Sequence, residues 1–170
     1  ILGALSVISI YKNVLKLNEK IFLNFRSPVG RGDHSIIKIG NKKINLIDES
    51  YNSNPLSLKS ALKNYDNIDT KKYRKYLLLG DMMELGAHSK KLHRSIVPLI
   101  NKTNIDKVFV MGKMVREIFK NITKVKRGRI LVNKLKIFEF IEKDLNNNDY
   151  LMIKASNATG FNKIVNNLNR

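Results

Sequence analysis

The sequence predicts an α/β fold: a Rossmann-like, mostly parallel β-sheet with helices on both faces. Short apolar runs alternate along the chain with longer stretches in which apolar residues recur at helical spacing. Because parallel strands need crossover helices between them, this alternation is typical of a parallel sheet. The expected strands are residues 34–39, 43–47, 76–79, 108–111, 129–132 and 150–153, and the expected helices are residues 55–65, 89–100, 114–122, 135–145 and 161–168.

The N-terminal segment differs from the rest because no strand pattern precedes its helices. Residues 1–17 and 18–25 have apolar residues at helical spacing and are expected to form helices. Residues 27–33 contain one Pro and two Gly, a combination that breaks regular structure and marks a domain boundary. The sequence therefore predicts a short helical segment over residues 1–28 and an α/β domain over residues 29–170.

The apolar start of the chain is expected to be a buried helix. Lys12 and Asn13 interrupt it well before the roughly 20 residues that a membrane-spanning helix needs, so no membrane span is expected. No basic start or small-residue cleavage site marks a signal peptide. The chain contains no Cys, so nothing argues for disulfides or thiolate metal sites, and a cytoplasmic location is the default.

The net charge of +18 is typical of nucleic-acid-binding modules. However, only 8 of the 32 basic residues are Arg, the side chain favoured for bidentate recognition of phosphates and bases. The Lys residues are scattered, so we expect a solvated Lys surface and no nucleic-acid partner. A basic face can still attract anionic substrates such as nucleotides. A salt-dependent gel shift of DNA would favour the nucleic-acid alternative.

Turn residues locate a hairpin and a helix start. The short turn at residues 40–42 separates the first two expected strands and predicts a β-hairpin. Pro55 suits the first turn of a helix, because proline fixes the backbone angle and lacks the N–H that would be unpaired there. Asn54 is the expected N-cap of this helix.

Polar or small residues follow the expected parallel strands. Ligands bind beyond the carboxyl ends of the strands in open α/β sheets, so these residues are better site candidates than the same residues elsewhere. They are Asp48-Glu49-Ser50, Gly80-Asp81, Gly112, Asn133 and Ala155-Ser156-Asn157.

Two of these strand ends carry long motifs. They read Ile47-Asp48-Glu49-Ser50-Tyr51-Asn52-Ser53-Asn54-Pro55 and Gly80-Asp81-Met82-Met83-Glu84-Leu85-Gly86. In this order they resemble two signatures of the C-terminal domain of the Mur ligase family. The resemblance implies an ATP-dependent ligase of peptidoglycan precursor synthesis, of the kind that joins D-alanyl-D-alanine to UDP-N-acetylmuramoyl-tripeptide through an acyl phosphate.

Four residues are expected to bind ATP. Arg31 lies between two glycines, where a guanidinium can reach a phosphate or can remain a solvated linker residue. The family carries a similar Gly-Arg-Gly-Glu stretch whose arginine contacts ATP, although Asp33 stands at the last position here. Glu49 can accept ribose hydroxyls, and it resembles the acidic residue that contacts the nucleotide in related ligases. Asn52 and Asn54 follow on the way into a helix, with helix capping as the alternative role.

Four residues are expected to bind substrate. Asp81 belongs to a motif with two acids and two glycines, which can hold a cation or an amine, or can form a turn that bonds its own backbone. Residues 154–160 open the last helix with hydroxyls and amides that can hold a carboxylate. They resemble a Lys-Gly-Ser-Arg stretch of the family, at the place where related ligases hold the incoming amino acid. Lys154, Ser156 and Thr159 therefore join Asp81 as candidates.

No metal site and no catalytic residue are expected within this chain. His88 and His93 are five residues apart, which misses the three- or four-residue spacing that places two ligands on one helix face.

The resemblance implies a piece of a longer enzyme. Ligases of this family need a P-loop for the ATP phosphates and Mg²⁺, and the Gly-x-x-x-x-Gly-Lys-Ser/Thr pattern is absent from these 170 residues. Residues 1–28 would then be the helical end of the central ATPase domain, and residues 29–170 the C-terminal domain. The N-terminal and central domains would be its partners and would supply most ligands of Mg²⁺, and the chain alone would be inactive. A noncatalytic Rossmann-like module is the remaining alternative, and absence of an upstream ATPase reading frame would support it.

Overall fold

The computed structural model describes residues 2–18, 20 and 29–169. Helix α1 (Leu2–Tyr11) is followed by the 3-10 turn η1 (Val14–Lys16). The helix expected over residues 1–17 thus ends early, at Tyr11, two residues before Asn13, which is a poor helix former. The helix expected over residues 18–25 lies almost wholly outside the described residues, as do the first two residues of the break expected at 27–33. No helix in the described ranges is long and apolar enough to cross a membrane.

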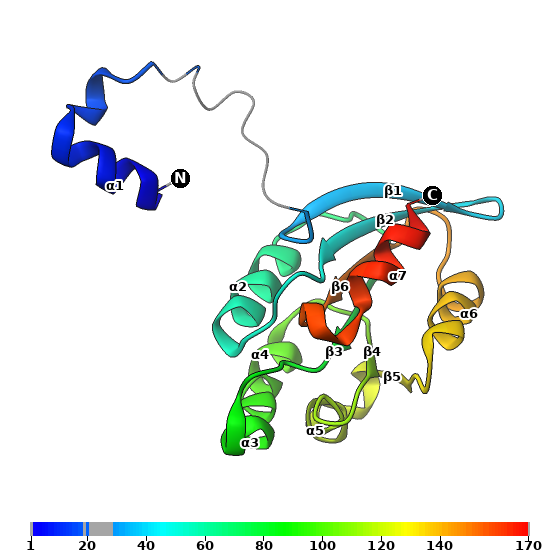
Figure 1. Cartoon of the computed structure of the whole chain (residues 1–170). Helices are drawn as coiled ribbons and strands as arrows, with labels where there is room; N and C mark the ends of the chain where they lie inside the picture. The colour runs from blue at the N-terminus through cyan, green and yellow to red at the C-terminus, as the bar shows by residue number, and fades with distance from the viewer. Residues whose placement is uncertain (1, 19, 21–28, 170) are drawn as a thin grey trace.

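Six strands in the described part of the chain form one sheet, in the order β1-β2-β6-β3-β4-β5 (Figure 1). The first two pair antiparallel as the predicted hairpin, and all other neighbours pair parallel. The carboxyl ends of the five parallel strands therefore lie at one edge. The strands are β1 (Asp33–Ile39), β2 (Lys42–Glu49), β3 (Lys75–Gly80), β4 (Lys107–Met111), β5 (Arg127–Ile130) and β6 (Tyr150–Lys154).

Strand β5 begins two residues before the position that the apolar pattern predicts. The apolar run of residues 129–132 continues past the strand, where Val132 is 71% exposed. Gly128 lets the strand approach its neighbour, because a Cβ there would lie 2.7 Å from the ring of Phe109. The contact of Gly128 with the Phe109 ring, which the apolar run could not reveal, accompanies this shift in the pairing of β5 with β4.

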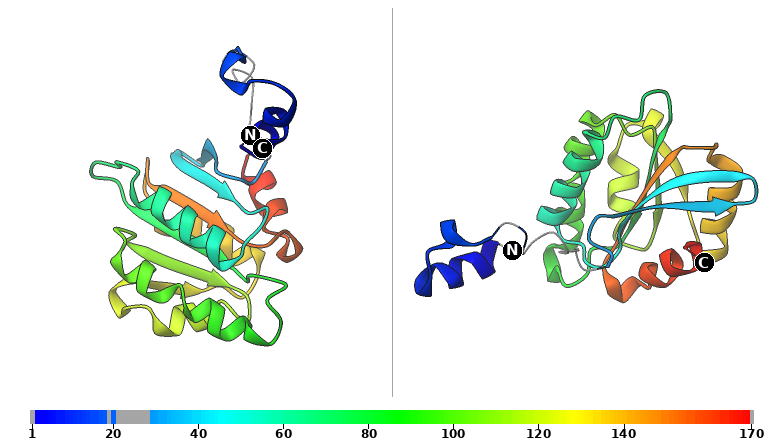
Figure 2. Two further views of the ribbon diagram at one scale, coloured as in Figure 1. Left: turned by 90° about the vertical axis from the view of Figure 1, so that its left-hand side faces the viewer. Right: turned by 90° about the horizontal axis from the view of Figure 1, so that it is seen from above.

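Helices cover both faces of the sheet, as predicted (Figures 1 and 2). One face carries α6 and α7, and the other carries α2, α4 and α5. Short 3-10 turns η3, η4 and η5 occur at Gly86–His88, Lys124–Lys126 and Asn157–Thr159. The helices are α2 (Pro55–Asp66), α3 (Ser89–Arg94), α4 (Val97–Lys102), α5 (Arg116–Asn121), α6 (Lys134–Asp144) and α7 (Phe161–Leu168).

The single helix expected over residues 89–100 is divided into α3 and α4. Pro98 lies in the first turn of α4. Because proline has no N–H to donate and its ring obstructs the preceding turn, one continuous helix through this position is unfavourable.

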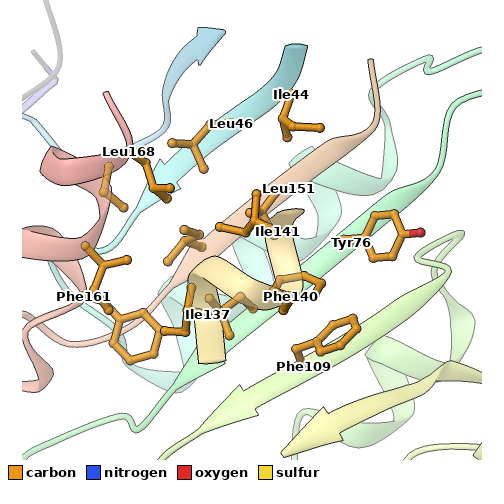
Figure 3. Close-up of a cluster of buried hydrophobic side chains, with 14 of the residues drawn as sticks. Ile44, Leu46, Tyr76, Phe109, Ile137, Phe140, Ile141, Leu151, Phe161 and Leu168 are labelled. Atoms are coloured by element: carbon orange, nitrogen blue, oxygen red, sulfur yellow. The ribbon is translucent and has the colours of Figure 1, made fainter. Parts of the chain in front are cut away.

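Two cores hold the layers together. Successive residues of β3, such as Leu77 and Leu78, enter opposite cores because strand side chains alternate between faces. In the α6–α7 core, Phe140 stacks on Phe109 with ring centroids 3.8 Å apart (Figure 3). The sheet is thereby fixed as a rigid support for the loops at its carboxyl edge.

Candidate functional site

Three loops meet at the carboxyl edge of the sheet, after β2, β3 and β6. They are neighbours because β6 lies between β2 and β3. The Ser156 amide donates to the carbonyl oxygen of Asp81 at 3.3 Å, and the Asn157 amide donates to that of Tyr51 at 3.1 Å. The fold thus joins motifs that are far apart in the sequence.

A pocket of about 370 Å³ lies between the ends of β2 and β6 and the first turns of α2. The four residues predicted to bind ATP all line this pocket, which we name the nucleotide pocket after that prediction: Arg31, Glu49, Asn52 and Asn54. Lys154 lines it too. Two cations, a carboxylate and amides suit a ligand that carries both anionic groups and hydroxyls.

The glycines beside Arg31 have a steric role. Gly30 has φ +81°, and a Cβ there would lie 2.9 Å from Cβ of Tyr51. The Gly30 amide also donates to the carboxylate of Asp33 at 2.7 Å, so the residue that departs from the family pattern closes this turn. The exposed Arg31 guanidinium lies 4.8 Å from the centroid of the Tyr51 ring. Stacking on Tyr51 therefore orients Arg31 at the pocket rim.

Lys154 is buried and points toward β2. Its side chain is 1% exposed, and Nζ lies 3.2 Å from Oε2 of Glu49. The ammonium also donates to the carbonyl oxygens of Glu49 and Asn52. Burial lowers the pKa of Lys154, and the Glu49 carboxylate opposes this effect. Lys154 thus lies with the residues predicted to bind ATP, and its own assignment to the dipeptide stays a prediction.

Asn54 is confirmed as the N-cap of α2. Its side-chain oxygen accepts from the amide of Ser57 at 2.8 Å, and the Asn54 amide donates to Oγ of Ser57 at 3.0 Å. This reciprocal pair is a capping box. The cap leaves the amide nitrogen of the Asn54 side chain available for a ligand, together with the second lone pair of its oxygen.

Asp81 holds the loop that follows β4. Its two carboxylate oxygens accept from the amides of Lys113 at 2.9 Å and Val115 at 2.7 Å. Gly112 is required beside them, because a Cβ there would lie 2.4 Å from the carboxylate. These contacts reach another loop, so they are not the local turn that the sequence offers as the alternative, and the role of Asp81 at a cation or an amine stays a prediction.

Ser156 joins two of the loops. Its hydroxyl accepts from the amide of Met83 at 3.0 Å and donates to the carbonyl oxygen of Ser53 at 3.1 Å. Thr159 donates its hydroxyl to the carbonyl oxygen of Ser156. The structure therefore brings Asp81, Ser156 and Thr159 into one neighbourhood, in which their side chains support the loops.

Sequence reasoning considered His93 only as a metal ligand and missed the contact of this completely buried α3 residue with the loop after β3. Its Nε2 accepts from the amide of Met82 at 3.0 Å, directly beside Asp81. The only signal in the sequence was the Gly80–Gly86 motif, which contains Met82, the partner of His93 in this hydrogen bond. Within the described residues, no group of three or more His, Asp or Glu side chains could hold a metal ion.

A larger pocket of about 520 Å³ lies at the opposite edge of the sheet, around residues 66–75. It contains none of the predicted site residues. Its carboxylates bind backbone amides, as when Asp106 accepts from Lys75 and Asp66 accepts from Asn104. Because the fold itself uses these groups, the smaller pocket at the carboxyl edge is the better site candidate.

Comparison with known proteins identifies the family. The family described as "Mur ligase, glutamate ligase domain" matches residues 36–157, and this chain belongs to it. The resemblance predicted from the two loops is therefore confirmed.

Curated relatives bear a more specific name. The UDP-N-acetylmuramoyl-tripeptide–D-alanyl-D-alanine ligase of Rickettsia prowazekii is 27% identical over 163 residues, which are 96% of this chain and 35% of the relative. The ligase of the same name from Buchnera aphidicola subsp. Acyrthosiphon pisum is 34% identical over 125 residues, which are 72% of this chain and 26% of the relative. The chain thus spans about a third of the length of these relatives or less.

Solved structures confirm the predicted fold. MurF from Thermotoga maritima, in complex with ADP, superposes with a TM-score of 0.73 at 18% identity, over 95% of this chain and 34% of that chain. MurF from Acinetobacter baumannii gives a TM-score of 0.69 at 18% identity, over 91% of this chain and 34% of that chain.

Proposed function

We propose that this chain is the C-terminal part of an ATP-dependent ligase that joins D-alanyl-D-alanine to UDP-N-acetylmuramoyl-tripeptide. The observation that carries the proposal is the nucleotide pocket, where Arg31, Glu49, Asn52 and Asn54 gather from separate segments. The names of the relatives support the choice of substrates. On the same sequence grounds as above, we expect the reaction in the cytoplasm.

Residues 1–28 would be the end of the central domain, and residues 29–170 the C-terminal domain. The composition of α1 supports this division. Although seven of the ten residues of α1 are apolar and the sequence predicts a buried helix, Ile10 is 74% exposed and Tyr11 is 81% exposed. Apolar side chains at a helix surface need a partner surface, which the remainder of a central domain would provide.

In the nucleotide pocket, Arg31 would bind a phosphate of ATP and Glu49 would accept hydrogen bonds from the ribose. Lys154 would hold Glu49 in place and neutralise part of its charge. The P-loop and most ligands of Mg²⁺ would come from the central domain. The bound metal would offset the phosphate charge while the residues of this chain orient the nucleotide.

The dipeptide site would be bordered by Asp81, Ser156 and Thr159. Their side chains already bind neighbouring backbone groups, so we propose that they shape the loops that receive D-alanyl-D-alanine. A role for Lys154 at the dipeptide carboxylate, as the sequence predicts, is the alternative to its role beside Glu49. When the domain closes on the central domain, these loops would exclude water from the acyl phosphate, which the dipeptide amine attacks to form the peptide bond.

A hybrid ligase tests this function. The part of the Rickettsia prowazekii relative that precedes its match to this chain would be joined to residues 1–170. We expect phosphate release that requires ATP, UDP-N-acetylmuramoyl-tripeptide and D-alanyl-D-alanine together, and no turnover by the chain alone. Turnover by the 170 residues alone would refute the proposal. A folded hybrid that does not consume the dipeptide, under conditions in which the intact relative consumes it, would also refute the proposal.

A further inference from the structure

His93 connects helix α3 to the loop after β3 through both ring nitrogens. Nε2 accepts a hydrogen bond from the Met82 amide at 3.0 Å, and Nδ1 lies 2.8 Å from the carbonyl oxygen of Ser89. A backbone amide can only donate, so Nε2 carries no proton, and Nδ1 must carry the proton that Ser89 accepts. The surroundings therefore select the neutral ring with its proton on Nδ1.

The hydrogen bonds continue from Met82 into the other loops. The next amide, that of Met83, donates to Oγ of Ser156 at 3.0 Å. Oγ of Ser156 in turn donates to the carbonyl oxygen of Ser53 in the loop after β2. One buried imidazole thereby fixes the first of three linked loops, although it lies outside every loop itself.

We propose that His93 is a positioning residue for the amine substrate, because it holds the Asp81–Leu85 loop in the position that binding of the dipeptide requires. This inference rests on the proposed function, since it concerns the loops assigned to D-alanyl-D-alanine. The nucleotide pocket depends on a different contact, between Lys154 and Glu49. Loss of His93 therefore affects the use of the dipeptide more than the use of ATP.

Two substitutions separate positioning from simple packing. His93→Gln keeps a side-chain oxygen that can accept from the Met82 amide. His93→Leu fills the space but leaves that amide buried without an acceptor, because Met82 is only 2% exposed. His88→Leu is the matched control, since His88 lies five residues away with an exposed side chain.

The tautomer can be measured on the chain itself, without any enzymatic assay. Long-range ¹H–¹⁵N correlation spectra should show the His93 proton on Nδ1, and the Met82 amide should exchange slowly with solvent. In His93→Leu the Met82 and Met83 amides should lose protection, while His88→Leu should leave them unchanged. A proton on Nε2, or a Met82 amide that exchanges as fast in the wild type as in His93→Leu, would overturn the inference.

Kinetics of the hybrid ligase complete the test. His93→Leu should raise KM for D-alanyl-D-alanine on the order of tenfold or more, leave KM for ATP within about twofold, and be largely rescued in His93→Gln. Equal changes in both KM values, or none, would refute the positioning role. If the wild-type hybrid itself showed no dipeptide-dependent turnover, the proposed function would fail instead. If His93→Leu did not fold, a His93→Gln hybrid with a raised KM for ATP alone would refute the inference.

Discussion

The ammonium of Lys154 lies 3.2 Å from the carboxylate of Glu49, and its side chain is only 1% exposed whereas that of Glu49 is 21% exposed. A buried charge is costly unless it is paired and hydrogen-bonded. Lys154 meets this condition through Glu49 and the carbonyl oxygen of Asn52. The pair ties β2 to β6 at the point where the nucleotide pocket begins.

Removal of this ammonium should chiefly raise KM for ATP. In the hybrid ligase, Lys154→Met frees the Glu49 carboxylate from its partner, so we expect KM for ATP to rise on the order of tenfold. Steady-state kinetics with each substrate varied in turn would measure the effect. Lys163→Met, at an exposed position on α7, is the matched control. A rise in KM for the dipeptide alone would instead support the role that the sequence predicts for Lys154.

The stability of the chain should depend on Lys154 at alkaline pH. Burial lowers the pKa of Lys154 below its ordinary value of 10.5, so the unfolded chain binds this proton more tightly than the folded chain. The free energy of unfolding should therefore rise relative to Lys154→Met as the pH increases from the lowered pKa toward 10.5. Urea denaturation of both proteins over this range would measure the difference. A difference that stays constant with pH would contradict the lowered pKa.

Asp81→Asn should destabilise the fold. An asparagine can offer only one oxygen to the two amides that Asp81 binds, and its own N–H would face the other amide. We expect the free energy of unfolding to fall by about 1–3 kcal/mol, as judged by urea denaturation of the chain. Glu84→Gln in the same loop, with an exposed side chain, should change it little. An unaltered stability in Asp81→Asn would show that these two bonds are dispensable.

Arg31→Ala should reduce activity far more than stability. The guanidinium is exposed and stacks on Tyr51, a contact worth about 0.5–1 kcal/mol at such a site. Loss of a phosphate contact should lower kcat/KM for ATP in the hybrid ligase by about tenfold or more. Arg116→Ala, an exposed arginine on α5, serves as the control. A lowered melting temperature of Arg31→Ala together with wild-type kinetics would show that Arg31 has a structural role instead.

Local signals in the sequence predicted much of the architecture. Apolar periodicity located the strands, and the Asn54-Pro55 pair predicted the start of α2. Periodicity failed at β5, where Gly128 closely approaches the ring of Phe109. It also failed at α3 and α4, because the apolar spacing continues through the proline that divides them.

The site was predictable where it depends on strand order and not where it depends on side-chain direction. Arg31 and Glu49 could be grouped in advance because the family resemblance assigned both to ATP, and the predicted hairpin places the start of the first strand beside the end of the second. The contact of Lys154 with Glu49 depends on the direction of the Lys154 side chain, which no motif specified. The contact of His93 with Met82 spans eleven residues and depends on how α3 packs, which no local pattern encodes.

The central claim is that the pocket between β2 and β6 holds the nucleotide, and Glu49→Gln tests it most directly. The substitution keeps the shape of the side chain but removes the charge that would bind the ribose hydroxyls. We expect the dissociation constant for ATP in the hybrid ligase, measured by calorimetry, to rise on the order of tenfold, while Glu142→Gln on the exposed side of α6 leaves it unchanged. A Glu49→Gln hybrid that folds and binds ATP as tightly as the wild type would contradict the account.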